Sequence, residues 1–169
     1  MTVDKQLPVA MKQLQSATDH LNLKDAIKFI DEAIESAQQE HYKSEFIVHK
    51  AMRLWFGGER HTAIDVLKSC CENHSDEPSA SFYLGEYLIE EANFSLAAQY
   101  LSDSIASSLA SGDSWYLDSA YLLHAYAAAK SGDKKAAMDS LAHISDDESI
   151  SWLDTAPLIS RESIQAMLS

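Results

Sequence analysis

The residues of this sequence that could do chemistry are seven histidines, two cysteines and several adjacent acids. The histidines form no His-Glu-x-x-His motif, and Cys70 and Cys71 lack the two-residue gap that a zinc site requires. Adjacent acids such as Glu90–Glu91 diverge on a helix and cannot form an acid–base pair for hydrolysis. Gly57–Gly58 is not followed by the Lys-Ser/Thr of a phosphate loop. We therefore expect a non-enzymatic protein without catalytic residues, metal or cofactor.

The composition is that of an acidic globular protein. Its 169 residues include 26 Asp and Glu against 13 Lys and Arg, which gives a formal net charge of −13. Nucleic acid and anionic membranes require clustered cations, so we expect neither as a partner. A basic protein would be attracted. The sequence shows no signal-peptide pattern and no apolar run long enough to span a bilayer, so we predict a cytoplasmic protein with reduced cysteines.

The clearest structural pattern is a pair of helices over residues 81–104. Apolar and small residues recur at helical spacing on one face of each helix: Leu84, Gly85 and Leu88, then Ala97, Leu101 and Ser104. Residues 92–94 form the joint between the helices. The pattern predicts two helices that pack against each other through these faces.

The same pattern recurs along the chain. The small residue of the second helix is Ala26, Ala63, Ala97 and Ala137, at intervals of 37, 34 and 40 residues. Twelve residues before each of these stand Leu14, Ala51, Gly85 and Ala125, of which three are small. Seven residues further on come Leu21, Gly58, Ala92 and Gly132. Small residues allow two helices to pack closely, and glycine suits a turn that needs a positive φ.

A helix–turn–helix unit of ~34 residues with small residues at these offsets resembles the tetratricopeptide repeat (TPR) family. The resemblance implies an all-α, right-handed superhelical TPR-like solenoid of about four repeats, over residues 7–39, 44–77, 78–111 and 118–150. Residues 151–169 would then form a C-terminal cap over the last open face. We expect residues 1–169 to form a single TPR-like domain.

Two segments outside the repeats have patterns of their own. Gly112 fits the position after a helix, and Asp113 or Ser114 fits the N-cap of the next, so we expect Trp115 and Tyr116 to begin that helix. The tail is predicted as two short helices. The first carries Ile150, Trp152 and Leu153, and the second begins at residues 155–157 and carries Leu158, Ile159, Ile164 and Met167.

In TPR proteins the first helices of successive repeats line a concave groove, so the resemblance implies a set of partner-binding residues. The groove-facing residues chosen here are Val48, Met52, Trp55, Phe82, Glu86, Ile89, Leu122 and Tyr126. Phe56 faces the same way in this frame. The central apolar side chains exceed what packing within a repeat needs, and burying each against a ligand contributes about 1.5–3 kcal/mol. The alternative is that superhelical curvature or the chain's own termini fill the groove.

The resemblance also allows one TPR binding mode to be argued against. Grooves that grip a partner's terminal carboxylate carry Lys and Asn at the positions that Val48 and Met52 occupy here. Without these donors a carboxylate clamp is not expected.

The function that these features favour is an adaptor or chaperone that binds an apolar or basic segment of another protein in its groove. The chain is loosely similar to bacterial TPR-type secretion chaperones. One alternative is an acidic inhibitor or immunity-type protein that neutralises a basic enzyme or toxin. Another is an assembly protein that forms a homodimer through the Trp152 tail.

Overall fold

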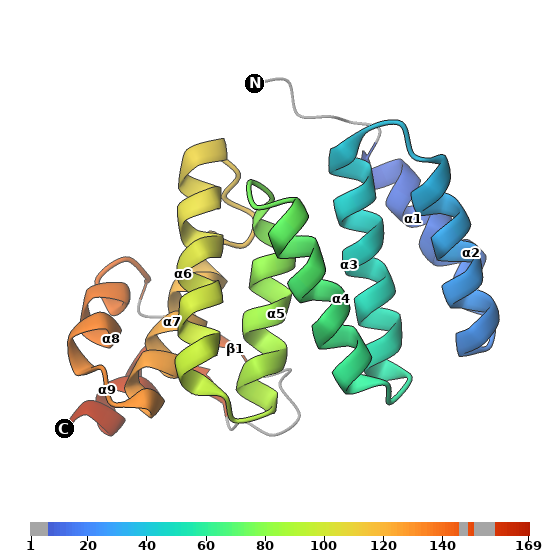
Figure 1. The fold of residues 1–169 in the computed structure, drawn as a ribbon. Helices are drawn as coiled ribbons and strands as arrows, with labels where there is room; N and C mark the ends of the chain where they lie inside the picture. Colours follow the sequence, from blue (N-terminus) through green and yellow to red (C-terminus); the bar gives the residue numbers. More distant parts are fainter. Residues whose placement is uncertain (1–6, 146–148, 151–157) are drawn as a thin grey trace. The chain divides into compact units, whose positions relative to one another are not determined.

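A computed structural model of the chain describes residues 7–145, 149–150 and 158–169 (Figure 1). The described residues form helices almost throughout, and the expectation of an all-α helical-repeat fold is confirmed. The chain divides into two compact units, Met1–His74 and Ser75–Ser169, which are described in turn. That the whole chain is a single domain stays a prediction.

The first unit consists of two helix pairs. Its helices are α1 (Leu7–Thr18), α2 (Leu23–Ser36), α3 (Glu40–Phe56) and α4 (Arg60–Asn73). The side chain of Asn22 caps α2 by accepting a hydrogen bond from the Asp25 N–H at 3.0 Å. Ala26, Ala51 and Ala63 are fully buried, as their predicted role at the helix contacts requires.

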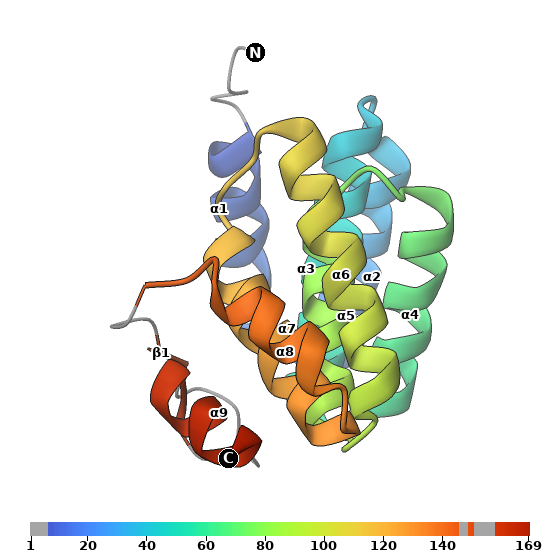
Figure 2. The ribbon, with the colours of Figure 1, turned by 90° about the vertical axis from the view of Figure 1, so that its left-hand side faces the viewer.

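The second unit continues the pairs and ends in a short tail. It contains α5 (Pro78–Glu90), α6 (Phe94–Ser111), α7 (Leu117–Ser131), α8 (Lys134–Leu141), β1 (Ser149–Ile150), β2 (Ile159–Ser160) and α9 (Arg161–Leu168). Successive helices pack on one another from α5 to α8. The tail packs mainly on α7, and Figure 2 shows α9 at the end of the chain beside α7 and α8.

The predicted small residues and turns have clear physical roles in the structure. A Cβ atom on Gly85 would lie 2.4 Å from Leu101 Cγ, so α5 approaches α6 as closely as a glycine permits. The predicted turn positions Gly58, Ala92 and Gly132 have φ angles of 89°, 56° and 89°. The left-handed turn therefore recurs in three of the four repeats.

The segment before α7 differs from the expectation. Gly112 is left-handed as predicted, with φ 74°. The Asp113 carboxylate, however, accepts a hydrogen bond from the Trp115 N–H at 2.9 Å instead of capping α7. This local turn competes with helix formation, so α7 begins at Leu117. The prediction that Trp115 and Tyr116 begin the helix was therefore wrong.

The tail also differs from the prediction. Ile150 does not lie in a helix but pairs with Ile159 in the two-residue antiparallel ladder of β1 and β2. The last helix begins only at Arg161, because Ser160 and Ser163 form a capping box at its N-terminus. Trp152, Leu153 and the predicted start at 155–157 lie outside the described residues.

Candidate functional site

The first unit contributes three of the predicted partner-binding residues, all on α3. Val48 and Trp55 are buried, with 3% and 6% of their surface exposed. The Arg60 guanidinium lies 4.6 Å from the centre of the Trp55 ring, a cation–π contact. Met52 is half-buried and keeps some accessible surface. Val48 and Trp55 therefore belong to the interior, and Met52 lies at its edge.

Phe56, the last residue of α3, lies in the same predicted stripe and is 78% exposed. It precedes Gly57 and Gly58, where the chain turns towards α4. With Met52 it provides accessible apolar surface on α3. The α3 stripe therefore has an interior part and an accessible part.

In the second unit, α5 contributes Phe82, Glu86 and Ile89, which are all buried. The Phe82 ring packs against Tyr116 at a centroid distance of 4.8 Å. Glu86 is a carboxylate in a helix that is otherwise mostly apolar. Burial first, and then the charge of Glu86, raise the pKa of the neighbouring Tyr87, so that its phenol stays protonated. These residues form the centre of the unit.

The remaining predicted residues, Leu122 and Tyr126, lie on α7. Leu122 is fully buried and Tyr126 is 5% exposed. The Tyr126 ring packs edge-on against Phe94 at 6.1 Å, and its pKa is raised by burial and then by Glu90. Because α6, α8, β2 and α9 all contact α7, the helix is buried on most of its circumference. The chain's own tail thus contributes to covering this helix.

The structure places seven of the eight predicted side chains in the interior and leaves Met52 partly accessible. Their role in partner binding stays a prediction. Sequence reasoning named Trp115 only as the start of a helix and did not name Leu109; they are 83% and 61% exposed. Their apolar type was visible in the sequence, but their exposure depends on the tertiary structure.

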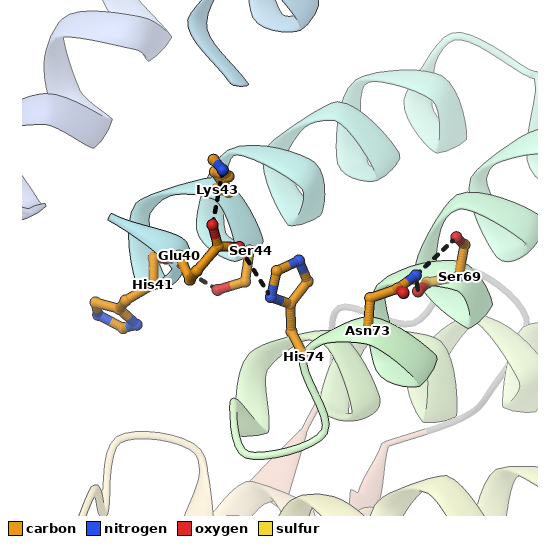
Figure 3. A network of polar contacts seen from close by, with 7 residues as sticks. All are labelled: Glu40, His41, Lys43, Ser44, Ser69, Asn73 and His74. Atoms are coloured by element: carbon orange, nitrogen blue, oxygen red, sulfur yellow. Dashed lines mark hydrogen bonds and ion pairs between the residues drawn. The ribbon is translucent and has the colours of Figure 1, made fainter. Parts of the chain in front are cut away.

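A small hollow of the first unit has a volume of about 260 Å³ and is lined by polar and apolar side chains. It includes Cys70, His74, Asn73 and the Lys50–Asp31 ion pair, whose Nζ–Oδ1 distance is 2.7 Å. The polar groups nearby already have partners within the chain (Figure 3). His74 Nδ1 lies 3.9 Å from a Glu40 carboxylate oxygen, and the Asn73 amide donates to the Ser69 carbonyl oxygen at 2.7 Å. These contacts give the hollow a structural role.

Two features are absent from the part of the chain that the structure describes. No group of three or more His, Cys, Asp or Glu residues is placed there to hold a metal ion. No described helix is long and apolar enough to cross a membrane. Cys70 is buried and Cys71 half-buried, and neither forms a disulfide in the part of the chain that the structure describes. Trp152, on which the homodimer alternative depends, lies outside the described residues.

The helix pairs, their close contacts at small residues and their left-handed turns define a TPR-like helical-repeat fold. The solved structure of the MamA RS-1 ArsTM double mutant matches with a TM-score of 0.59 and 16% identity, over 82% of this chain and 72% of that one. A solved structure of nearly identical TPR-like repeats from a putative kinesin light chain of Podosopora anserina matches with a TM-score of 0.58 and 13% identity. The match covers 85% of this chain and 75% of that one. The structure of a point variant of the same repeats matches with a TM-score of 0.56 and 14% identity, over 82% of this chain and 70% of that one.

At sequence identities this low, the similarity to these structures shows the fold alone. No protein-family model matches the sequence, and no curated protein matches it either. The comparisons therefore agree with the TPR-like repeat predicted from residue spacing.

Proposed function

We propose that the protein is a non-enzymatic interaction module, an adaptor or chaperone of the cytoplasm, that binds a basic or apolar segment of another protein. The observation that carries the proposal is the charge distribution on the TPR-like fold. Residues 69–129 contain nine Asp or Glu and no Lys or Arg. Residues 75–169 contain fifteen acids and four basic residues, whereas residues 1–74 contain eleven and nine. A basic segment is therefore attracted most strongly to the second unit.

An apolar segment of a partner would first contact those residues of the predicted groove that are accessible to solvent. Met52 and Phe56 provide this surface on α3, and methionine adapts readily to different apolar ligands. Deeper members of the predicted set would require a local opening of their unit to reach a partner. We therefore place the first apolar contact of the groove at Met52.

The test compares partner capture by the wild-type chain and by Met52→Glu, using extract of the native host and mass spectrometry. We expect Met52→Glu to reduce capture of the main partner roughly tenfold or more, because a buried carboxylate is costly at an apolar contact. Met138→Glu is a matched control, since Met138 is 63% exposed on α8. Trp55→Ala is unsuitable, because truncating a buried Trp costs about 3–5 kcal/mol of stability.

Circular dichroism should show that both variants keep the helicity of the wild type. If Met52→Glu captures the same partners in the same amounts, the groove contact is refuted. If neither the wild type nor Met138→Glu enriches any protein over a blank resin, the proposed function itself fails.

A second candidate function is supported by the burial of most of the predicted groove. With the apolar stripe in the interior, the excess of acidic residues in the second unit suits an inhibitor or immunity-type protein that neutralises a basic enzyme or toxin. Such a complex would weaken steeply with ionic strength, because exposed charges are screened within about 10 Å at 0.1 M salt. Measuring the dissociation constant from 50 to 500 mM NaCl separates the two functions. A salt-insensitive complex would contradict the inhibitor function.

A further inference from the structure

One face of α1 borders an open hollow. Six side chains of this helix line the hollow, which has a volume of about 790 Å³: Pro8, Val9, Lys12, Gln13, Ser16 and Ala17. Val9 is 55% exposed, and Lys12 and Ser16 are exposed as well. These three residues are spaced by three and then four positions, so their side chains follow one line along the helix. We call them the α1 row.

The repeat shows what packs on the same row elsewhere in the chain. With Leu14 aligned to Ala51 and Ala125, the α1 row corresponds to Phe46, His49 and Arg53 on α3, and to Ala120, Leu123 and Ala127 on α7. Phe46 is 8% exposed and belongs to a core cluster with Ile30 of the preceding helix, α2. The three α7 residues are fully buried, and the helix before them, α6, packs on α7. The row is thus covered in α3 and α7 and open in α1.

The polar residues of the α1 row do not set it apart from a covered row. His49 is polar, yet it is 4% exposed and its Nε2 lies 3.5 Å from Thr18 Oγ1. The Arg53 guanidinium donates to the Thr18 carbonyl oxygen at 3.2 Å. A row with one apolar and two polar residues is therefore packed against the preceding helix pair in this same chain.

The covering helix uses a face of its own. On α2 this face includes Leu23, Ile27 and Asp31, which are spaced by four residues. Leu23 lies at the turn that follows α3, because a Cβ atom on Gly57 would meet Leu23 Cδ2 at 2.6 Å. The Asp31 carboxylate pairs with Lys50 of α3 at 2.7 Å. This face of α2 therefore turns towards the following helix.

The same face is covered on α6 and open on α8. On α6 it includes Phe94 and Ala98, and the Phe94 ring packs on Tyr126 of the following helix at 6.1 Å. Met138 of α8 is 63% exposed, whereas its counterparts Ile27 and Ala98 are half-buried. When the second helices are aligned by their small residue, the α8 positions of this face are Lys134, Met138 and Ala142, which are all exposed. We call these three residues the α8 row.

We infer that the protein associates with further copies of itself end to end, with the α8 row of one copy packed on the α1 row of the next. The contact repeats the packing of α2 on α3, so a second copy has the geometry that both open rows fit. Because the two rows differ, each copy keeps one row open after a contact forms. Association then continues along a series or closes into a ring, of which a dimer with two such contacts is the smallest. The inference does not depend on the proposed function, and it uses neither the predicted groove nor Trp152.

The charges near the two rows suit this contact. Phe94 lies beside Tyr126, in the C-terminal half of the following helix, and Lys134 is the counterpart of Phe94 on α8. The contact therefore brings Lys134 near the C-terminal end of α1, where Asp19 is exposed. The Lys134 ammonium donates to the Leu168 carbonyl oxygen at 2.9 Å and has further donors for a carboxylate. Helix α1 itself contains no Asp or Glu, so it adds no carboxylate that would repel an acidic second copy.

The test measures the mass of the protein by sedimentation equilibrium at rising concentration. About 0.3 M NaCl is used, because the net charge of −13 makes copies repel one another and salt screens this repulsion. We expect the wild type to associate. Val9→Glu and Met138→Glu should each raise the dissociation constant of the contact roughly tenfold or more, because each places a carboxylate within it. Leu109→Glu is the matched control: Leu109 is 61% exposed, lies on α6 in neither row, and should associate like the wild type.

A mixture of the two variants tests the pairing of the rows. Val9→Glu keeps an intact α8 row and Met138→Glu keeps an intact α1 row, so mixing them should form a one-to-one complex and nothing larger. A contact between two identical faces does not give this result, because one variant would then associate alone. The inference is overturned if the wild type stays monomeric throughout, if either variant alone associates like the wild type, or if the mixture forms no complex.

Further measurements separate this inference from its alternatives. Circular dichroism should show wild-type helicity in both variants, and Val9→Ser and Met138→Ser replace them if it does not. If Trp152→Ser abolishes association while Val9→Glu does not, the copies pair through the tail and the inference is wrong. Met138→Glu should be monomeric and still capture the partner through Met52, so failure of the end-to-end contact and failure of the proposed function are distinguishable.

Discussion

At the scale of single residues, Ala92 carries a backbone conformation that suits glycine. Its φ of 56° makes it the only described residue other than glycine with a positive φ. The corresponding turn positions in repeats two and four are Gly58 and Gly132. An alanine in this region incurs a cost of about 1–2 kcal/mol, partly offset by the smaller entropy of its unfolded chain.

We therefore predict that Ala92→Gly raises the free energy of unfolding by up to about 1 kcal/mol, measured by urea denaturation. Ala106→Gly is the control, because Ala106 is exposed within α6. There the same substitution should lower the free energy of unfolding by about 1 kcal/mol. An equal loss of stability in both variants would contradict a left-handed Ala92.

Two histidines make stability depend on pH. Burial lowers the pKa of His49 and of His124 from the ordinary value of 6.5, and the Arg53 cation lowers that of His49 further. His124 Nδ1 lies 2.7 Å from Ser140 Oγ. In both cases the unfolded chain binds the proton more readily than the folded chain, so stability is fully present above pH 6.5 and is lost as pH falls below it.

The expected result is a free energy of unfolding that falls between pH 7.5 and pH 5.5, with a smaller fall in His124→Gln. Urea titrations at several pH values measure the free energy of unfolding, and an NMR titration of the imidazole rings measures the pKa of each histidine directly. A His124 ring that titrates at or above pH 6.5 would refute this explanation.

At the scale of secondary-structure elements, the contact between α5 and α6 depends on the absence of one Cβ atom. Gly85→Ala would place its Cβ 2.4 Å from Leu101 Cγ. Leu101 is fully buried and has little room to move. We predict a loss of about 1–3 kcal/mol in the free energy of unfolding, as for overpacking in other cores.

The double variant Gly85→Ala/Leu101→Ala tests the cause. Removing the leucine relieves the clash, so the two losses should not add, and a double-mutant cycle should show coupling above about 0.5 kcal/mol. Strict additivity would show that the loss has another origin. Ser95→Ala, at an exposed position of α6, should leave stability nearly unchanged.

At the scale of the whole molecule, the net charge of −13 belongs mostly to residues 75–169. Like charges repel in the folded state, and salt screens them. Raising NaCl from 20 to 200 mM should therefore raise the melting temperature, by about 2–4 °C for each kcal/mol of repulsion removed. Hydrogen exchange should show a larger gain of protection in α5–α7 than in α1–α4. An equal gain in both regions would contradict the uneven charge distribution as the cause.

Much of the fold follows from local physics that the sequence contains. The intervals between Ala26, Ala63, Ala97 and Ala137 predict the helix pairs, because close packing requires a small side chain wherever two helices meet. Gly112 and Gly132 predict helix ends, because a left-handed residue needs no Cβ. The turn at Asp113 and the strand at Ile150 were missed, since short-range hydrogen bonds and pairing compete there with helical periodicity.

The sequence by itself thus determined the repeat, the helix ends near glycines and the acidic character of the chain, whereas the boundary of its more acidic second unit came from the structure. Only the tertiary structure decided which apolar residues are accessible. Leu122 and Trp115 are both apolar residues, yet one is fully buried on α7 and the other, just before α7, is 83% exposed. The reason is physical: α7 is contacted by distant segments such as β2 and α9, whereas Tyr116 occupies the inward position beside Phe82 and leaves its neighbour Trp115 in solvent.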